Sequence, residues 1–342
     1  MSRPSTLASA LTLSTIAFTF RTLARLTTRE FKVDGLPILL DVLKIGHDEK
    51  GKGKVLEGEE SDQSTKQRRG IVTVCNHNSV VDDPMMWSLM PLTTYFPFAR
   101  PSHTCRNTRW TLGASDIMFT NSFNNKFFDL GQVIETHRGG GIFQPAVDRA
   151  VKLLQDGEWI HIFPEGKVNQ QGTNPEGGLL RFKWGVGRII MDSKIMPEII
   201  PIWISGFDQV MPEPRNWPRF IPRPGAKISI TVGQPLTSSI EPLVSSWRSM
   251  AEKESGTLGI GGDWESESAP TSQRQGETGG LAGDAQREVR GRGELIDGRE
   301  QEVRMKIVDV LQEGVMRLGE EVERREGRFE KGLWSQSTKR ST

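Results

Sequence analysis

Two residues, His77 and Asp82, have the types and the spacing of a general base and the carboxylate that orients it. They lie in the segment 76–84 (NHNSVVDDP). In a helix, five positions at about 100° each would place the two side chains on different sides of the axis. Across a turn they can meet, and a carboxylate bound to one imidazole nitrogen leaves the other nitrogen free to take a proton from a hydroxyl. The chain has no G-x-S-x-G motif to supply a serine nucleophile, so we expect the substrate to bring the attacking hydroxyl.

The residues on either side of this pair predict the turn that it needs. The run 71–74 is apolar and β-branched, which is typical of a buried strand. Asp83 followed by Pro84 is typical of a helix start, with Asp83 as N-cap and Pro84 at the first helical position. The pair is therefore expected on the loop that joins a strand to a helix.

A second group of candidate residues follows a predicted strand at 159–163. Pro164 stops the strand, and Gly166 permits a left-handed backbone close to a ligand. Between them, Glu165 has two interpretations: it accepts hydrogen bonds from a polyol headgroup, or it caps the local backbone. Both stay open at this point.

Cations at three places suit a phosphate. Arg138 ends a predicted strand and precedes the glycines 139–141, and arginine beside free backbone amides binds phosphate well. Arg181 and Lys183 are two residues apart and cannot share a helical face; of these we favour Lys183. Within the turn itself, Asn76 and Ser79 are candidates for stabilising an oxyanion, or are plain turn and cap residues.

The order of the predicted elements indicates an α/β domain with a mainly parallel or mixed central sheet flanked by helices. We expect active residues at the ends of its strands. The predicted strands are 71–74, 132–136, 159–163, 199–204 and 227–232, and the predicted helices are 145–155 and 179–191.

The N-terminal residues 1–30 predict a segment that interacts with a membrane or targets the chain. No acidic residue occurs from Met1 to Thr28, and the apolar run from Leu7 to Phe20 is shorter than the roughly 20 residues that span a bilayer. The alternatives are a secretory segment, a mitochondrial targeting segment and a helix in the membrane interface. We favour targeting or interfacial anchoring, with a spanning helix third. The aromatic run 95–98 either enters the membrane leaflet that the N-terminal segment contacts or packs in the core.

The C-terminal part divides into three segments. Residues 249–300 are rich in Gly, Ser, Glu, Gln and Arg, which predicts a disordered insertion. Residues 301–330 have apolar residues at helical spacing and predict an amphipathic helix that docks on the core rather than on a membrane, with Gly314 as a weak point. Residues 331–342 form a tail. The Gly-, Lys- and Glu-rich residues 47–70 predict an exposed loop.

Composition excludes several classes of function. A net charge of +1 gives no reason to expect nucleic acid. Two cysteines, of which Cys75 is predicted as an inert core residue, cannot form a disulfide framework or a multi-cysteine zinc site. Scattered carboxylates around single histidines lack the spacing of a metal site, so we expect no metal and no cofactor.

Four ordered segments together resemble the conserved blocks of glycerolipid acyltransferases. They are 76–84, the strand end at Arg138, the sequence FPEG at 163–166, and IPI at 200–202. The block at Arg138 matches only loosely. More narrowly, residues 161–169 (HIFPEGKVN), 180–185 (LRFKWG) and 114–120 (ASDIMFT) resemble the branch of that family that exchanges acyl chains between phospholipids and lysophospholipids in mitochondria. The resemblance covers about residues 70–235 and implies an acyltransferase domain at 31–248.

This resemblance implies a reaction and roles for the candidate residues. His77 would be the general base on the hydroxyl of a lysophospholipid, oriented by Asp82, in a transacylase that remodels cardiolipin without CoA. The residues that would bind substrate are Glu165, Gly166, Arg138 and Lys183, with Asn76 and Ser79 near the oxyanion.

The resemblance also implies partners and a place in the cell. The partners would be cardiolipin, phosphatidylcholine, the membrane surface and mitochondrial membrane complexes. The protein would lie peripherally on mitochondrial membranes, facing the intermembrane space.

Two other functions compete with this one. An acyl-CoA-dependent lysophosphatidate-type acyltransferase would share the fold and the turn, although Lys167 stands where such enzymes more often carry Thr or Ser. A non-catalytic membrane-binding scaffold is the alternative of another class, and the presence of His77, Asp82 and Glu165 together argues against it.

Overall fold

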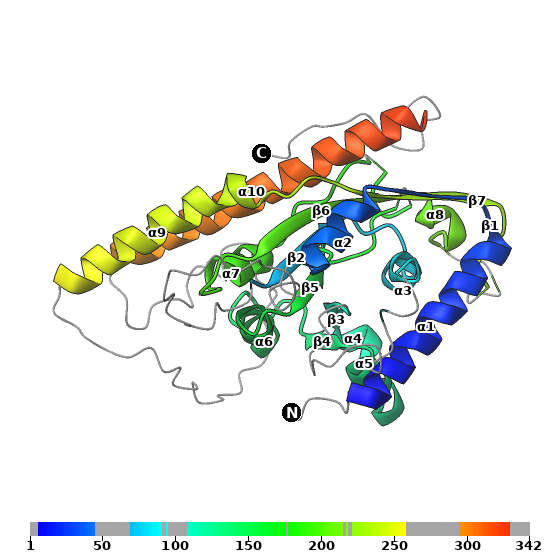
Figure 1. Cartoon of the computed structure of the whole chain (residues 1–342), viewed down its shortest axis with the longest axis horizontal. Helices are drawn as coiled ribbons and strands as arrows, with labels where there is room; N and C mark the ends of the chain where they lie inside the picture. Colours follow the sequence, from blue (N-terminus) through cyan, green and yellow to red (C-terminus); the bar gives the residue numbers. More distant parts are fainter. Residues whose placement is uncertain are drawn as a thin grey trace, which may run out of the picture.

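A computed structural model describes residues 6–44, 69–90, 94, 108–170, 172–175, 177–214, 217, 221–257 and 294–328. Its centre is a seven-stranded sheet in the order β1-β7-β6-β2-β5-β3-β4 (Figure 1). The strands are β1 (Thr28–Asp34), β2 (Ile71–Cys75), β3 (Trp110–Ala114), β4 (Val133–Thr136), β5 (Trp159–Ile162), β6 (Glu198–Ser205) and β7 (Ala226–Val232).

Five neighbouring strands of this sheet run in the same direction. β2 is parallel to both β5 and β6, and β3 is parallel to both β5 and β4. β7 is antiparallel to β6, and β1 is parallel to β7. The prediction of a mainly parallel or mixed sheet is confirmed. The carboxyl ends of β6, β2, β5, β3 and β4 therefore lie along one edge, where the loops that carry the candidate residues begin.

Helices cover both faces of the sheet. One face packs on α6 (Pro145–Gln155), α7 (Gly185–Met191), α9 (Thr237–Thr257) and α10 (Glu294–Arg325). The other packs on α1 (Thr6–Thr27), α2 (Leu36–Lys44), α3 (Asp82–Trp87) and α8 (Phe207–Val210). The remaining described helices, α4 (Ser115–Met118) and α5 (Ser122–Leu130), join β3 to β4. Figure 1 shows α9 and α10 side by side on one side of the sheet and α1 on the other.

The start of α3 differs from the sequence prediction. The helix begins at Asp82, its N-cap is Val81, and no side chain caps it, so the prediction of Asp83 as N-cap is wrong. The Asp83 carboxylate instead binds the guanidinium of Arg109, while Asp82 binds the backbone of the preceding turn. The tertiary contact of Asp83 with Arg109 thus takes the place of the predicted N-cap.

The predicted helix 179–191 begins later than expected, at Gly185. The backbone N–H groups of Leu180 and Lys183 donate to the Glu165 carboxylate and the Pro164 carbonyl rather than within a helix. Contacts with the candidate site thus replace the first turns of this helix. By contrast, the helix 145–155 is confirmed at both ends.

The N-terminal helix α1 is longer than the apolar run that predicted it. It continues to Thr27, and Leu7–Thr27 is the one described helix that is long and apolar enough to cross a membrane, with about a quarter of its most apolar window buried. Its buried side is packed on α3 and on the sheet.

Both ends of the segment 249–300, predicted as a disordered insertion, are helical. Residues 249–257 belong to α9 and residues 294–300 to α10, while 258–293 lie outside the described residues. The prediction that the C-terminal helix docks on the core is confirmed, because Ile307, Leu311 and Val315 are fully buried against β6, α7 and α9. The predicted tail, the aromatic run 95–98 and most of the loop 47–70 also lie outside the described residues.

Two glycines of α10 give opposite predictions for the same substitution. A Cβ on Gly319 would lie 2.5 Å from a ring carbon of the buried Trp203, whereas a Cβ on Gly298 meets nothing within 4 Å. Overpacking costs about 1–3 kcal/mol, and Gly to Ala in an open helical position gains about 1 kcal/mol. We expect Gly319→Ala to lower Tm and Gly298→Ala to raise it, measured by thermal unfolding in the same detergent. Equal shifts would contradict the docked position of α10.

Candidate active site

His77 and Asp82 meet on the turn between β2 and α3, as predicted. His77 Nδ1 lies 2.8 Å from Asp82 Oδ2, and the same oxygen accepts the backbone N–H groups of Asn78 at 2.5 Å and Ser79 at 2.7 Å. Asp82 is fully buried and His77 is 21% exposed in its side chain. Since Nδ1 is occupied, Nε2 is the nitrogen that can exchange a proton with a substrate.

Burial sets the electrostatics of this pair. It raises the pKa of Asp82, and the hydrogen bonds from His77 and from the two backbone N–H groups act in the opposite direction. The Asp82 carboxylate attracts the positive charge that develops on the imidazole as a proton is transferred to it. The arrangement suits general base catalysis followed by general acid catalysis.

The Glu165 carboxylate accepts hydrogen bonds from neighbouring groups of the protein, including the turn that carries His77. Its Oε1 accepts the backbone N–H of His77 at 2.7 Å, and its Oε2 accepts from Asn169 Nδ2 at 2.6 Å and Leu180 N at 2.9 Å. The side chain is 1% exposed. Of the two interpretations from the sequence, this geometry supports the carboxylate that binds the local backbone. Glu165 ties together the turn after β2, the turn after β5 and the segment before α7.

The two oxyanion candidates, Asn76 and Ser79, differ in their hydrogen bonds. Asn76 is fully buried: its amide bonds Asn78 and both the N–H and the C=O of Ile204, which fixes the end of β2 to β6. The structure therefore contradicts Asn76 as an oxyanion donor. Ser79 is also buried, and its hydroxyl has no hydrogen-bond partner among the described residues.

The cations lie further from the turn. Arg138 is exposed and pairs with Asp116 at 3.3 Å, at the end of β4. β5 and β3 separate β4 from β2, so at strand spacings near 4.8 Å the two strand ends are about 14 Å apart. Lys183 is exposed, and its aliphatic carbons lie beside Gly166, whose φ of 72° confirms the predicted left-handed backbone. Lys183 thus borders the loop of Glu165, while Arg138 borders the far end of the same sheet edge.

Two groups that the sequence did not indicate contact the turn between β2 and α3. The ring of Phe163 stacks on His77, with centroids 4.4 Å apart and planes at 23°. Arg109 donates through Nε to Asp83 at 2.9 Å and through Nη1 to the carbonyl of Gly131 at 2.9 Å. The FPEG motif contained Phe163, whereas nothing near Arg109 in the sequence indicated a partner 26 residues away.

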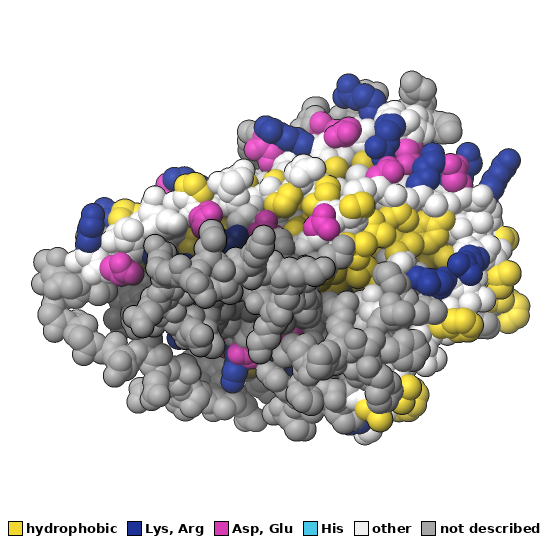
Figure 2. All heavy atoms as spheres, in the orientation of Figure 1, with side chains coloured by type: hydrophobic (Ala, Val, Ile, Leu, Met, Phe, Trp, Pro, Cys, Tyr) yellow, Lys and Arg dark blue, Asp and Glu magenta, His cyan; other side chains and the backbone are white. Residues whose placement is uncertain are grey.

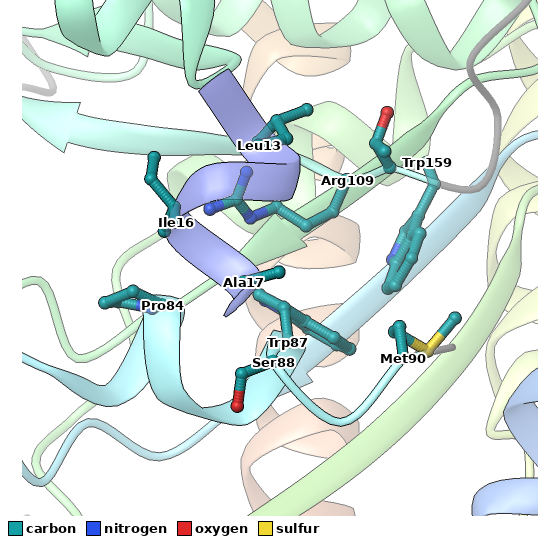
Figure 3. Close-up of a pocket in the computed structure, with 10 residues that line it drawn as sticks. Leu13, Ile16, Ala17, Pro84, Trp87, Ser88, Met90, Arg109 and Trp159 are labelled. Atoms are coloured by element: carbon teal, nitrogen blue, oxygen red, sulfur yellow. The ribbon is translucent and has the colours of Figure 1, made fainter. Parts of the chain in front are cut away.

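A pocket lies next to α3 on the face covered by α1 (Figure 3). Apolar side chains of α1 form one side, and Pro84, Trp87, Arg109 and Trp159 form the other. Its empty volume is about 360 Å³, which includes the open mouth. No group of three His, Cys, Asp or Glu side chains in the described part of the chain is placed to hold a metal ion.

The pKa of Glu165 predicts a pH-dependent stability. Burial raises it to about 7, against the opposing hydrogen bonds from Leu180, His77 and Asn169. Because the folded-state pKa lies above the ordinary value, the stability that Glu165 contributes is full below about pH 4.5 and is lost as the pH rises through 7. The loss amounts to about 3 kcal/mol.

We therefore expect the Tm of the wild-type protein, relative to Glu165→Gln, to fall between pH 5 and pH 8. Differential scanning fluorimetry of both proteins in one detergent measures this difference. Glu198→Gln, at a half-buried glutamate of β6, is the control. A difference that stays constant with pH would show that Glu165 does not titrate in this range.

Comparisons with known proteins find similarity to acyltransferases. A family model described as acyltransferase matches residues 57–205. A Dictyostelium discoideum protein named Taffazin is 39% identical over 178 residues, which cover 51% of this chain and 57% of that protein. A Drosophila melanogaster Tafazzin is 40% identical over 178 residues, covering 50% and 42%. An Arabidopsis thaliana N-acylphosphatidylethanolamine synthase is 36% identical over 177 residues, covering 51% and 58%. The chain thus spans about half the length of these relatives.

Proposed function

We propose that this chain, an acyltransferase-family protein over residues 57–205 with tafazzins among its relatives, transfers acyl groups between phospholipids. The observation that carries the proposal is the His77–Asp82 pair at the carboxyl edge of the sheet, with Nδ1 bound and Nε2 left for the substrate. Such a pair activates a hydroxyl that the substrate supplies.

In the proposed reaction, His77 Nε2 takes the proton of a lysophospholipid hydroxyl as its oxygen attacks the ester carbonyl of a second phospholipid. The tetrahedral intermediate then expels the alkoxide of the donor lipid. The His77 imidazolium returns the proton to that alkoxide, so one new phospholipid and one new lysophospholipid form. Acid–base help of this kind contributes about 10²–10⁴-fold.

The finer assignment, cardiolipin remodelling without CoA on mitochondrial membranes, is supported by the tafazzin relatives and by the motifs around Glu165 and Lys183. An acyl-CoA-dependent lysophospholipid acyltransferase is the alternative with the same turn. The Arabidopsis relative, by its name, forms an N-acyl product on phosphatidylethanolamine, so an amine acceptor is a further candidate.

One assay separates these activities. Purified full-length protein is added to liposomes of cardiolipin, phosphatidylethanolamine and labelled lysophosphatidylcholine, with and without acyl-CoA. We expect label in phosphatidylcholine without added thioester. Transfer that requires acyl-CoA would overturn the CoA-independent reaction, and acylation of the amine alone would overturn the hydroxyl acceptor.

Exposed apolar side chains support contact with a membrane surface. Leu7, Leu11 and Phe18 of α1 are exposed, and Phe123 and Phe127 of α5 are exposed and stacked, while α5 has no buried residue. Ser9 Oγ donates to the carbonyl of Leu130 at 2.7 Å, which ties α1 to the end of α5. Figure 2 shows hydrophobic side chains at the surface along α1 and over α2. We propose that α1 and α5 enter the same leaflet, beside the pocket of Figure 3.

The double variant Phe123→Ser, Phe127→Ser is expected to weaken vesicle binding by about tenfold or more, because each buried Phe contributes about 1.5–3 kcal/mol. Flotation with vesicles of phosphatidylcholine and cardiolipin measures this. The control is Phe143→Ser, an exposed phenylalanine that contacts Arg188 and Arg304 at the opposite face of the sheet. Equal flotation of the double variant and the wild type would contradict insertion of α5.

A further inference from the structure

A column of aromatic rings runs inward from the catalytic histidine. His77 stacks on Phe163, and Phe163 is perpendicular to His161 at 88°, with centroids 4.5 Å apart. His161 is perpendicular to Trp87 at 4.9 Å, and Trp87 to Trp159 at 4.7 Å. The column therefore connects His77 to the side chains that line the pocket of Figure 3.

His161 is the polar member of the column's interior, and it is fully buried. Its Nδ1 lies 2.8 Å from Thr73 Oγ1, which also accepts the indole N–H of Trp159 at 2.9 Å. Its Nε2 has no hydrogen-bond partner among the described residues. Burying a histidine with one unpaired ring nitrogen costs more free energy than burying a leucine at the same place, so the residue calls for an explanation.

The donors and acceptors around Thr73 favour one tautomer of His161. The indole N–H can only donate, so Thr73 Oγ1 accepts there and has its own hydrogen to give. Among the hydrogen bonds of the described residues, His161 Nδ1 is the one acceptor that Thr73 Oγ1 reaches. Thr73 uses its own hydrogen only when it donates to Nδ1, and in that tautomer the ring proton of His161 is on Nε2, within the column.

His161 also carries no charge at neutral pH. Burial holds its pKa well below the ordinary value, and the charges of Arg109 and His77 act in the same direction. A neutral His161 adds no positive charge near His77, and such a charge would repel the imidazolium that forms during catalysis.

We propose that His161 is a positioning residue: fixed as its Nε2–H tautomer by Thr73, it holds the ring of Phe163 flat against His77. This inference rests on the proposed function of His77 as general base. Asp82 fixes one edge of the His77 ring, and Phe163 fixes its plane. Without His161 the Phe163 ring loses its support on the inner side. The plane of the His77 ring is then less restricted, and Nε2 points toward the substrate for a smaller share of the time. A displacement of about 1 Å in such a group costs on the order of 10²-fold in rate.

The test compares His161→Leu and His161→Phe in the full chain. We expect His161→Leu to lower kcat by about 10–100-fold with KM within about twofold. His161→Phe keeps a ring against Phe163 and is expected to retain more activity than His161→Leu. Ile160→Ala, a buried change on the other face of β5, is the control: it lowers Tm but leaves kcat within about twofold.

Nuclear magnetic resonance of protein with ¹⁵N-labelled histidine gives a readout that fold stability does not move. The chain has five histidines, so the signals can be assigned by substitution. We expect His161 to show the Nε2–H tautomer and to stay neutral at pH 7, and the ring-current shift of His77 to disappear in His161→Leu.

Unchanged His77 signals together with unchanged kcat in His161→Leu would overturn the inference. Equal losses in the leucine and phenylalanine variants, with His77 signals as in the wild type, would do the same. Acyl transfer that persists in His77→Ala would instead overturn the proposed function, so the two failures are distinguishable.

Discussion

Replacement of His77 by alanine is expected to lower kcat for acyl transfer by about 10²–10⁴-fold, with little change in Tm. The imidazole is the group whose Nε2 remains free once Asp82 has bound Nδ1, and no other side chain named in the site can take the hydroxyl proton at neutral pH. Glu165 is occupied by three N–H donors, and Lys183 is a cation. Initial rates in CoA-free liposomes, with labelled lysophosphatidylcholine as acceptor, measure the effect.

The matched control is His137→Ala. His137 is an exposed histidine after β4 that bonds Ser115 Oγ at 2.9 Å and contacts neither His77 nor Asp82 in the described structure. We expect its rate to stay within about twofold of the wild type. A His77→Ala rate within threefold of the wild type would contradict the assignment of the base.

The second large effect is expected from Asp82, where two substitutions separate chemistry from folding. Asparagine keeps a carbonyl oxygen for His77 and for the N–H groups of Asn78 and Ser79 but loses the negative charge that stabilises the imidazolium. We expect Asp82→Asn to lower kcat by about 10²–10⁴-fold.

Alanine at the same position removes the acceptor altogether. Two buried backbone N–H groups then lack a partner, at about 1–3 kcal/mol each, so Asp82→Ala should lower Tm as well as kcat. Rates and Tm of the two variants, measured together, give this comparison. Wild-type kcat in Asp82→Asn, or equal Tm values for the two variants, would contradict the role given to the carboxylate.

The turn that carries His77 and Asp82 was predictable because every determinant is local. A β-branched strand, a loop of six residues and a helix start lie within 71–84, and the meeting of His77 and Asp82 follows from them. The exact start of α3 was not predictable. Asp83 has the sequence of an N-cap, but its carboxylate is bound by Arg109 and by the indole N–H of Trp87. The Arg109 contact is tertiary and leaves no local pattern.

Two strands of the sheet also lacked a readable pattern. β1 is an edge strand with only two apolar residues, Phe31 and Val33, which are too few for an alternation to stand out, and β3 is five residues long and contains Gly113. The sequence placed Glu165 correctly at a strand end. Its partners, the N–H groups of His77 and Leu180, depend on how two loops pack together, so no local pattern indicated them.

CoA-independent exchange of acyl chains is tested by the acyl balance in liposomes that contain cardiolipin with labelled acyl chains, unlabelled lysophosphatidylcholine and no CoA. Mass spectrometry then follows every labelled chain. We expect each lysophosphatidylcholine consumed to give one labelled phosphatidylcholine and one lyso form of cardiolipin, with no free fatty acid. Release of fatty acid without transfer, or transfer that starts only when acyl-CoA is added, would contradict CoA-independent exchange.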